Sequence, residues 1–514
     1  MTGSASFSLR PNHPVARQLD DLVAEFHLTR VGSPTPASVT GVSLDSSAVV
    51  PGDLYVGLSG ARDHGANYAT QAAAAGAVAV LTDVAGQERA CAAQLPVIIA
   101  DDPRSLLGAV AAWVYRTAGD SPRLLGVTGT NGKTTVVYFL YALIRQLGDR
   151  AGLTSTAERR IGEQALVSSL TTPEAPELHA LLARMREERV AVAAIEVSAQ
   201  ALSRHRVDGV HFDVVGFTNL SHDHLDDYAT MDDYFDAKRE LFVADRAARA
   251  VVTVGSPWGD RLAATCPIPV TTLTTSPEIP AQWCVQVTSE SLDGTAFTLR
   301  AEDGRKLTTW IPLIGAHNAA NAALAIVMLV ELGYSFASLQ QAVETPDGIP
   351  AYVPGRTEVV SGPRGPRVLI DYGHTPDAFR ATLSSLRAVT SGRIIMLFGA
   401  DGNRDTTKRS EMGAIAARGA DVVIVTDFHP RWEDPAEIRR ALMSGALLAV
   451  PDGDIREIPD PHEALRAALA LAQSGDVVLY AGPGHEDYRE VAGMHLPYSA
   501  REDARSALRE AGWL

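Results

Sequence analysis

From Arg123 onward, short continuous apolar runs alternate with segments of helical periodicity along the chain. The clearest early runs are Leu124–Val127, Val190–Val197 and Val214–Phe217. Strands that are apolar on both faces are typical of parallel sheets that helices cover on each side. The pattern therefore predicts an α/β fold with mostly parallel sheets.

The same pattern resumes after residues 352–355, where Tyr-Val-Pro-Gly is typical of a linker. The later runs are Val368–Ile370, Ile394–Phe398, Val422–Val425 and Val477–Tyr480. Because these runs also alternate with helical segments, a second α/β sheet is expected in the last third of the chain.

The length of 514 residues suggests about three domains at roughly 150 residues each. We expect a small N-terminal α/β domain at 1–118 and a central P-loop-type domain with a mostly parallel sheet at 119–353. A C-terminal Rossmann-like α/β domain is expected at 354–514. Residues 250–310 look richer in β-structure and more irregular than the rest.

Charge and composition exclude several kinds of partner. The formal net charge is −16, so binding along a nucleic-acid backbone is not expected. No apolar run approaches the roughly 20 residues that span a bilayer, and the N-terminus lacks the apolar core of an export signal. The 3 cysteines follow no metal-binding or disulfide spacing. We therefore expect a cytoplasmic protein, acting as a monomer.

Polar residues follow several of the predicted strands at their carboxyl ends. Glu196, His224 and Asp371 each lie at or just after the end of an apolar run. Ligands of open α/β sheets bind outside these strand ends. A cleft between domains is therefore the expected active site.

The segment Gly129–Thr135, Gly-Thr-Asn-Gly-Lys-Thr-Thr, lies between a predicted strand and a predicted helix. Glycines let backbone N–H groups close around a triphosphate, Lys133 can reach the outer phosphates, and a threonine hydroxyl can ligate Mg²⁺. Because residue 127 is valine, the match is to a shorter Gly-x-x-Gly-Lys-Thr variant of the Walker pattern. The alternative is a glycine-rich turn with an incidental lysine. We expect ATP to bind here.

Two further side chains are candidate metal ligands. Glu196 ends an apolar strand, where an unpaired carboxylate is costly and can help to hold Mg²⁺. An ion pair with Arg204 or Arg206 is the alternative. His224 belongs to a cluster of two histidines and two aspartates within residues 222–226. The cluster favours a metal-adjacent site over a loop histidine that is only hydrogen-bonded.

Lys238 falls on the inward stripe of a predicted helix. Across residues 234–242 the apolar positions recur at i, i+1, i+7 and i+8, and Lys238 lies at i+4. A lysine whose stem covers apolar surface is the alternative. Burial lowers the pKa of a lysine amine, and only the neutral amine takes up CO₂ to form a carbamate. Such a carbamate is an anion able to ligate a second Mg²⁺.

Together these motifs make the chain resemble the Mur ligases of peptidoglycan synthesis, most closely their tripeptide-forming members. The resemblance covers nearly the whole chain. Besides the motifs above, it rests on Ser43–Ser46, Pro51–Val56, Leu170–Pro173, Glu196–Ser198, Tyr234–Phe242, Gly315–Asn321, Val353–Arg356, Asp371–Asp377 and Gly482–Glu486.

The resemblance implies an ATP-dependent amide ligase. The implied ATP-binding residues are Gly129, Thr130, Asn131, Gly132, Lys133, Thr134, Thr135, Asn318, Arg356 and Asp371. Two Mg²⁺ ions would be held through Thr134, Glu196, His224 and Lys238, the last as the carbamate N6-carboxylysine. The implied catalytic residues are Lys133, Glu196, His224 and Lys238.

The resemblance also implies the two other substrates. UDP-MurNAc-L-Ala-D-Glu would contact Ser46, Thr171, Thr172, Ser198 and Arg206. Its D-Glu carboxylate would attack the γ-phosphate of ATP, and a diamino acid would then displace phosphate from the acyl phosphate. The diamino acid would contact Arg404, His429, Arg431, Gly482 and Glu486, with Arg404 on its α-carboxylate. This chemistry needs positioning and cations more than a protein nucleophile.

The chain departs from the family pattern near the implied amino-acid site. Members that take meso-diaminopimelate carry Asp-Asn-Pro-Arg where this chain has Phe428-His429-Pro430-Arg431. Arg431 can still bind a carboxylate bidentately, but Phe428 replaces the acid that would pair with the distal amino group. Pro483 replaces the usual lysine of Gly-Lys-Gly-His-Glu, and Ala199 and Gln200 stand where Ser-His is frequent. We therefore expect L-lysine or a similar diamino acid rather than meso-diaminopimelate.

Three alternatives remain. Another Mur ligase or a folylpolyglutamate synthetase would share the central motifs but should lack the domain around residues 51–53 or the Thr-Thr-Pro segment. A nucleotide hydrolase would not need Lys238 or the third domain. A non-catalytic paralogue is suggested by Phe428 and Pro483, although such a protein would not need a metal site.

Overall fold

The computed structural model describes residues 9–33, 35–60, 62–119 and 121–514. The first eight residues, on which the expectation about export partly rests, lie outside this description. The chain divides into two compact units. Unit 1 comprises residues 1–126, 148–215 and 240–249, and unit 2 comprises residues 127–147, 216–239 and 250–514.

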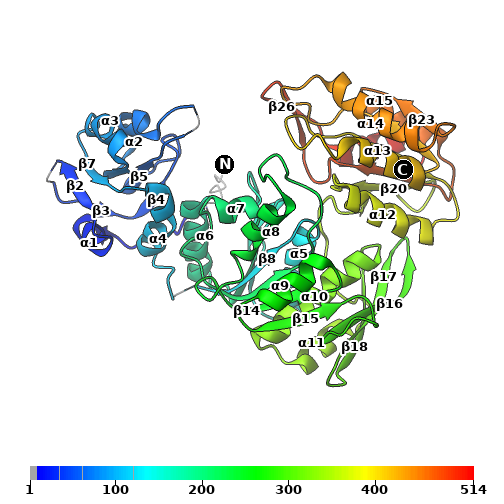
Figure 1. Ribbon diagram of the computed structural model, residues 1–514, viewed down its shortest axis with the longest axis horizontal. Helices are drawn as coiled ribbons and strands as arrows, with labels where there is room; N and C mark the ends of the chain where they lie inside the picture. The colour runs from blue at the N-terminus through cyan, green and yellow to red at the C-terminus, as the bar shows by residue number, and fades with distance from the viewer. Residues whose placement is uncertain (1–8, 34, 61, 120) are drawn as a thin grey trace, which may run out of the picture. The chain divides into compact units, whose positions relative to one another are not determined.

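Unit 1 begins with a five-stranded sheet in the order β2-β7-β6-β5-β4 (Figure 1). Its strands are β2 (Thr29–Gly32), β4 (Gly41–Ser43), β5 (Asp53–Gly57), β6 (Ala79–Thr82) and β7 (Pro96–Ile99). All neighbouring strands pair in parallel except β2 with β7. Alternate residues of β5 enter different cores: Leu54 packs with α1 (Leu19–Glu25) and α4 (Pro103–Tyr115), and Tyr55 packs with α2 (Ala69–Ala75). Helices therefore cover both faces.

The middle of the chain forms an eleven-stranded sheet, in the order β11-β10-β9-β12-β8-β13-β14-β15-β16-β17-β18. The strands are β8 (Arg123–Thr128), β9 (Ala151–Thr154), β10 (Glu158–Ile161), β11 (Gln164–Val167), β12 (Val192–Glu196), β13 (Phe212–Phe217), β14 (Ala247–Thr253), β15 (Val270–Thr274), β16 (Trp283–Ser291), β17 (Gly294–Ala301) and β18 (Lys306–Ile311). β9 pairs in parallel with β12, and β15 pairs in parallel with both β14 and β16. The two ends of the sheet are antiparallel.

The helices that accompany these strands include the one that follows the glycine-rich loop. They are α5 (Lys133–Gln146), α6 (Ala175–Glu187), α7 (Ala199–Ser203), α8 (Met231–Arg239), α9 (Pro257–Thr265), α10 (Ala316–Leu332) and α11 (Phe336–Val343). α10 packs against α5 within unit 2. Twelve residues of α10 are buried, which explains why it is almost wholly apolar.

The last third of the chain forms a six-stranded sheet in the order β19-β20-β24-β21-β22-β23. The strands are β19 (Glu358–Val359), β20 (Arg367–Asp371), β21 (Ile394–Phe398), β22 (Val422–Val425), β23 (Asp454–Glu457) and β24 (Val477–Ala481). All pairs are parallel except β19 with β20.

Helices cover both faces of this six-stranded sheet as well. Alternate residues of β21 separate into two cores, with Met396 in one and Leu397 in the other. The first core is completed by α12 (Pro376–Val389), α13 (Arg409–Gly419) and α14 (Pro435–Ala449), and the second by α15 (Pro461–Leu471) and α16 (Ala500–Glu510). A sheet wound on both faces is the Rossmann-like arrangement.

The expected fold class, α/β with mostly parallel sheets, is confirmed. Every apolar run named above contains or overlaps a strand, and residues 250–310 contain the antiparallel β16-β17-β18 meander. The hairpin of β25 (Tyr488–Val491) and β26 (Met494–Pro497) was not predicted. The domain bounds at 118 and 353 stay predictions.

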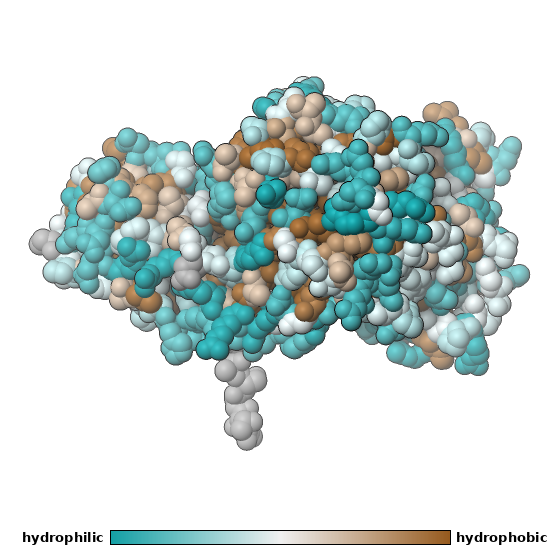
Figure 2. Space-filling view, turned by 90° about the horizontal axis from the view of Figure 1, so that it is seen from below, coloured by the Kyte–Doolittle hydropathy of each residue, from teal (hydrophilic) through white to brown (hydrophobic). Residues whose placement is uncertain are grey.

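Among the described residues, no helix combines the length and the apolar character that crossing a bilayer needs. On the face shown in Figure 2, hydrophilic and apolar residues are interspersed. Scattered apolar residues of this kind are normal for a folded protein surface.

Candidate active site

The glycine-rich loop joins the end of β8 to the start of α5, as the sequence predicts. Gly129 and Gly132 have φ values of +147° and +87°, which favour glycine. A Cβ atom on Gly129 would lie 1.9 Å from the hydroxyl of Thr218, and one on Gly132 would lie 2.5 Å from the side-chain oxygen of Asn321. The loop therefore needs both glycines for its conformation and for close packing. Its position at a helix N-terminus suits an anion.

The loop is attached to the segment after β13. The amide of Asn131 donates to the side-chain oxygen of Asn219 (3.0 Å), and the hydroxyl of Thr218 donates to the carbonyl of Asn131 (2.7 Å). Lys133 Nζ donates to the carbonyls of Gly129 and Thr130 at 3.1 and 2.9 Å. The Lys133 ammonium is thus held at the loop that the sequence assigns to phosphates.

Lys238 lies on the inner face of α8, so the prediction that it is buried is confirmed. Its side chain is among the largest fully buried ones, with 1% exposure. Nζ donates to the carbonyl of Gly129 at 2.9 Å and lies 4.4 Å from the ring centroid of Tyr234. Both contacts stabilise an ammonium group. They also place the amine directly beside the glycine-rich loop.

His224 has two carboxylates within reach. Ligand atoms of His224, Asp226 and Asp227 all lie within 4.8 Å of one another. Desolvation, with the nearby charges of Lys238 and Lys133, lowers the pKa of His224, so its imidazole is neutral near pH 7 and can ligate a cation. The backbone of His224 has a φ of +56°, a conformation that non-glycine residues seldom adopt. Asp227 was missed by the sequence analysis, although the His-Asp-His cluster before it pointed to this segment.

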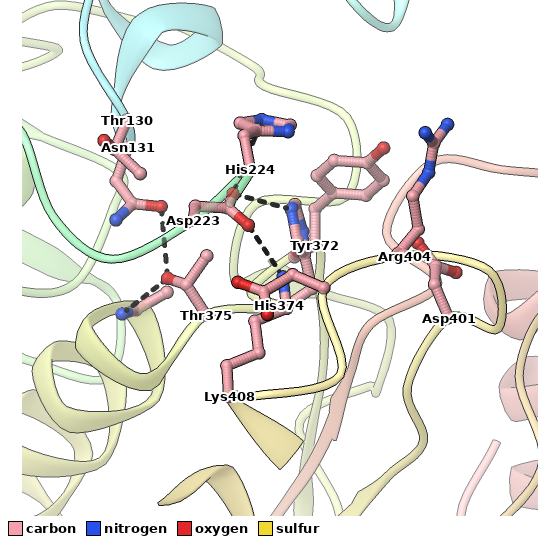
Figure 3. A network of polar contacts seen from close by, with 12 residues as sticks. Thr130, Asn131, Asp223, His224, Tyr372, His374, Thr375, Asp401, Arg404 and Lys408 are labelled. Atoms are coloured by element: carbon pink, nitrogen blue, oxygen red, sulfur yellow. Dashed lines mark hydrogen bonds and ion pairs between the residues drawn. The ribbon is translucent and has the colours of Figure 1, made fainter. Parts of the chain in front are cut away.

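A buried ion pair joins this segment to the C-terminal sheet region of unit 2 (Figure 3). Lys408 Nζ donates to Asp223 Oδ1 at 2.8 Å, and the side chains are only 9% and 6% exposed. His374 Nε2 and His224 Nε2 lie 3.8 and 3.5 Å from Asp223 Oδ2. Burial alone would raise the pKa of Asp223, but Lys408 and the histidines hold it well below its usual range. Lys408 was not among the residues predicted from the sequence.

Other C-terminal residues reach the glycine-rich loop within unit 2. Arg356 donates to the hydroxyl of Thr134 at 3.0 Å and lies 4.3 Å from the ring centroid of Tyr372. Thr375, the N-cap of α12, donates to the side-chain oxygen of Asn131 at 3.4 Å (Figure 3). Arg356, expected from the sequence near ATP, therefore lies beside the loop.

The remaining residues expected near ATP hold local structure. Asp371 accepts hydrogen bonds from the backbone amides of Thr357 (2.7 Å) and Gly373 (2.6 Å). Asn318 donates to the carbonyl of Ile314 at 2.8 Å and accepts from Asn321 at 3.3 Å. Because Asn321 packs against Gly132, Asn318 connects indirectly to the loop.

Glu196 lies at the end of β12, in unit 1, and gathers three of the expected substrate residues. Its carboxylate accepts from the amide (2.9 Å) and hydroxyl (3.1 Å) of Thr156, and that hydroxyl also lies 3.1 Å from Thr171 Oγ1. Thr172 donates to the carbonyl of Glu196 at 2.7 Å and accepts from the amide of Ser198 at 3.1 Å. Thr171, Thr172, Ser198 and Glu196 thus form one polar cluster.

Two more expected substrate residues have other surroundings. Arg206 donates to Glu174 at 2.8 Å, so this arginine pairs with Glu174, which also binds Arg104 at 2.6 Å. Ser46 is buried in the turn after β4. Among the described residues, no hydrogen bond links Ser46 to the Glu196 cluster.

The expected amino-acid residues lie at the ends of β21, β22 and β24, in unit 2. His429 is buried; its Nδ1 accepts from the amide of Glu490 at 2.8 Å, so its Nε2 donates to Glu486 at 2.8 Å. Gly482 has a φ of +116° and donates to the carbonyl of Asp371. Arg404 lies 3.8 Å from Asp226, beside the His224 segment.

Arg431 and Asp427, the acidic residue just before Phe428, are both paired with other side chains of the protein. Arg431 Nε donates to Glu490 at 3.0 Å, and its φ is +52°. Asp427, one residue before Phe428, forms an ion pair with Arg439. Phe428 itself is 6% exposed, and its ring centroid lies 3.9 Å from that of His429, with the two ring planes tilted by 45°. His429, Arg431 and Glu486 thus belong to one hydrogen-bond network, in which Glu490 on β25 contacts both His429 and Arg431.

Comparisons with known proteins agree along the whole chain. Three family models match: the Mur ligase family catalytic domain at residues 38–115, the Mur ligase middle domain at 127–329, and the Mur ligase glutamate ligase domain at 355–484. The UDP-N-acetylmuramyl-tripeptide synthetase of Leifsonia xyli subsp. xyli is 66% identical over 514 residues, covering 100% of both chains.

Two more relatives carry more specific names. The UDP-N-acetylmuramoyl-L-alanyl-D-glutamate–2,6-diaminopimelate ligase of Streptomyces coelicolor is 42% identical, over 92% of this chain and 93% of its own. A solved structure with the same enzyme name is 26% identical, with a TM-score of 0.65, and the match covers 97% of this chain and 100% of that one.

Proposed function

Because the chain belongs to the Mur ligase family and groups with its UDP-N-acetylmuramyl-tripeptide synthetases (MurE), we propose that it adds a diamino acid to UDP-MurNAc-L-Ala-D-Glu at the expense of ATP. The product is a peptidoglycan precursor. The full-length identity of 66% to the Leifsonia synthetase is the observation that carries the proposal.

The chemistry follows from the nucleotide loop. The D-Glu carboxylate attacks the γ-phosphorus of ATP, and ADP leaves. The incoming amine then attacks the carbonyl carbon of the acyl phosphate, loses a proton and expels inorganic phosphate, so that an amide bond forms. Lys133 and the backbone amides of Gly129–Thr135 bind the phosphates, and Arg356 adds a positive charge beside Thr134. Phosphoryl transfer of this kind depends on positioning and charge stabilisation. In this proposal, Thr130, Asn131, Gly132, Thr135, Asn318 and Asp371 complete the ATP site.

The donor groups fit Mg²⁺. Mg²⁺ prefers oxygen ligands, and the neutral imidazole of His224 lies with the carboxylates of Asp226 and Asp227. Thr134, Glu196 and His224 would hold the first ion, which would neutralise phosphate charge. Lys238, as a carbamate, would support a second. Its burial beside Gly129 supports this role, although its present contacts also suit an ammonium group.

The three expected domains divide the substrates among them. Residues 1–118 would bind the UDP-sugar with Ser46, residues 119–353 would bind ATP, and residues 354–514 would bind the incoming amino acid. Thr171, Thr172, Ser198 and Arg206 would contact the dipeptide; the clustering of the first three around Glu196 supports this assignment.

The identity of the diamino acid has two candidates. The name of the Streptomyces relative favours 2,6-diaminopimelate over the L-lysine suggested by the sequence, and we take the meso form as the candidate stereoisomer. L-lysine or a shorter diamino acid stays the second candidate, because Phe428 offers no carboxylate and Asp427 is paired with Arg439. Arg404, His429, Arg431, Gly482 and Glu486 would form the amino-acid site in either case.

An amine panel tests the proposal. The protein is given ATP, Mg²⁺ and UDP-MurNAc-L-Ala-D-Glu, with meso-diaminopimelate, L-lysine, L-ornithine or L-diaminobutyrate supplied separately. We expect tripeptide and phosphate only when dipeptide and a suitable amine are both present. Phosphate release with ATP alone would indicate a hydrolase, and binding of ATP without turnover of any amine would indicate a non-catalytic paralogue.

A further inference from the structure

The hairpin β25-β26 holds the amino-acid loop from one side. The amide of Arg431 donates to the carbonyl of Glu490 at 3.0 Å, and the amide of Ala492 donates to the carbonyl of Arg431 at 2.7 Å. Arg489 Nε donates to the carbonyl of Phe428 at 3.0 Å. These bonds fix residues 428–431 to β25 along most of the loop, and they keep Arg431 in its positive-φ conformation.

The guanidinium of Arg431 is surrounded by acceptors. Nε donates to the carboxylate of Glu490 at 3.0 Å, Nη1 donates to the carbonyl of Gly402 at 3.5 Å, and Nη2 lies 3.8 Å from Asp401 Oδ2. The Arg431 side chain is only 17% exposed. A carboxylate that binds Arg431 must therefore compete with groups of the protein, foremost with Glu490.

We propose that Glu490 is a specificity-determining residue that disfavours a second carboxylate in the incoming amino acid. The site around Arg431 then favours amines that lack a second carboxylate. This inference rests on the proposed function, because it takes Arg431 as part of the amino-acid site. meso-Diaminopimelate carries a second carboxylate on its distal carbon, whereas L-lysine carries only an ammonium group there.

Glu490 and a carboxylate of the substrate compete electrostatically for the guanidinium of Arg431. Charge-assisted hydrogen bonds between a guanidinium and a carboxylate are roughly twice as strong as neutral ones. A carboxylate of the substrate must share the guanidinium with Glu490, which holds Nε at 3.0 Å, and it also meets the like charges of Glu490, Asp401 and Glu486. Like charges brought together in a partly buried site select against the wrong partner. An ammonium end meets the same three carboxylates favourably.

The test compares the wild type with Glu490→Gln. Glutamine keeps the backbone bonds from residue 490 to Arg431 and His429 and removes only the negative charge. Steady-state kinetics with saturating ATP and dipeptide give kcat/KM for meso-diaminopimelate and for L-lysine. We expect the ratio of the two values to shift about tenfold towards meso-diaminopimelate, mainly through its KM.

The control is Glu510→Gln, which removes the same charge from an Arg–Glu pair elsewhere, since Arg466 donates to Glu510 at 2.8 Å. This variant should leave the ratio unchanged. If both kcat/KM values of Glu490→Gln fall together or stay the same, their ratio is unchanged and the inference is overturned. Loss of a residue that only holds the loop in place would affect both amines alike. If the wild type forms tripeptide with none of the amines, the proposed function itself is refuted. The two failures are therefore distinguishable.

Discussion

The nucleotide loop and the amino-acid loop, both in unit 2, are built on different principles. The nucleotide loop at 129–135 owes its shape to glycines that other residues cannot replace, because a Cβ on Gly129 would lie 1.9 Å from Thr218. The amino-acid loop at 428–431 is held by hydrogen bonds to β25 and is lined by polar side-chain pairs, such as Arg431 with Glu490 and His429 with Glu486.

The difference suggests how one scaffold keeps its reaction while its amine can change. Backbone groups and buried lysines are indifferent to the amine, so changes in the nucleotide loop should reduce turnover with every amine. Side-chain pairs can be exchanged one at a time, so changes in the amino-acid loop should alter which amine is used. Each of the following predictions tests one side of this contrast.

The largest effect is expected for Lys133→Ala. The ammonium of Lys133 lies over the carbonyls of Gly129 and Thr130, where the phosphates are proposed to bind. Removing a preorganised positive charge from a phosphoryl-transfer site costs about 10³-fold in kcat. Quenched-flow or coupled assays should show this loss equally with meso-diaminopimelate and L-lysine. A loss confined to one amine would break the contrast.

Lys238→Ala should abolish measurable ligation, with a loss of kcat similar to or slightly smaller than that of Lys133→Ala. Added bicarbonate should not restore activity. Lys238→Arg is the informative companion, because a guanidinium keeps the positive charge near the carbonyl of Gly129 but cannot form a carbamate. We expect this variant to be inactive as well. Near-normal turnover by the arginine variant would remove the carbamate role and leave a structural cation.

Breaking the Asp223–Lys408 pair should have the third-largest effect. Lys408→Met leaves the buried Asp223 charge without its nearest cation. We therefore expect the free energy of unfolding, measured in urea at pH 7, to fall by about 3 kcal/mol. Turnover should fall with all amines, since Asp223 also contacts His224. The charge-swapped double variant Asp223→Lys, Lys408→Asp should recover part of the lost stability; no recovery would show that the pair itself is unimportant.

The same pair gives a pH dependence with a definite sign. The pKa of folded Asp223 lies below the ordinary value of 3.8, so its charge stabilises the fold above that value. This contribution is lost as the pH falls through the folded pKa. In Lys408→Met, burial without the cation raises the pKa of Asp223, so this carboxyl takes up a proton at a higher pH than in the wild type. The stability difference between wild type and Lys408→Met should therefore be largest near pH 7 and shrink as the pH falls, starting above the ordinary value of 3.8.

The smallest effect is expected for Asp427→Asn. Asp427 follows β22 next to the amino-acid loop, but its carboxylate is occupied by Arg439. We expect the preference between L-lysine and meso-diaminopimelate to change by less than about twofold. A large shift, measured by direct competition between the two amines, would show that Asp427 binds the distal amino group in place of Phe428.

The sequence predicted local features well and long-range pairs poorly. The apolar runs predicted β8, β13 and β21, and the helical spacing placed Lys238 on the inward face of its helix, where the structure shows it to be buried. Lys408 was missed because its partner Asp223 lies 185 residues away and nothing in its neighbourhood marks it as buried. Glu490 was missed because the hairpin β25-β26 that carries it was not predicted.

The expectation of L-lysine shows a further limit. It compared Phe428 and Pro483 with a family pattern, but a single substituted position does not show what else the side chains around it contact. The structure adds that Asp427 and Arg431 are both paired, with Arg439 and Glu490 respectively. Amine choice therefore depends on several charges together, and the sequence shows them only one at a time.

The central claim is that the protein activates a carboxylate as an acyl phosphate, and oxygen transfer tests it most directly. UDP-MurNAc-L-Ala-D-Glu labelled with ¹⁸O in the terminal D-Glu carboxylate is converted with ATP, Mg²⁺ and the best amine of the panel. We predict one ¹⁸O atom in each phosphate released, because the attacking carboxylate oxygen leaves with the phosphorus. Phosphate free of ¹⁸O alongside tripeptide formation, or phosphate released without dipeptide, would contradict the account.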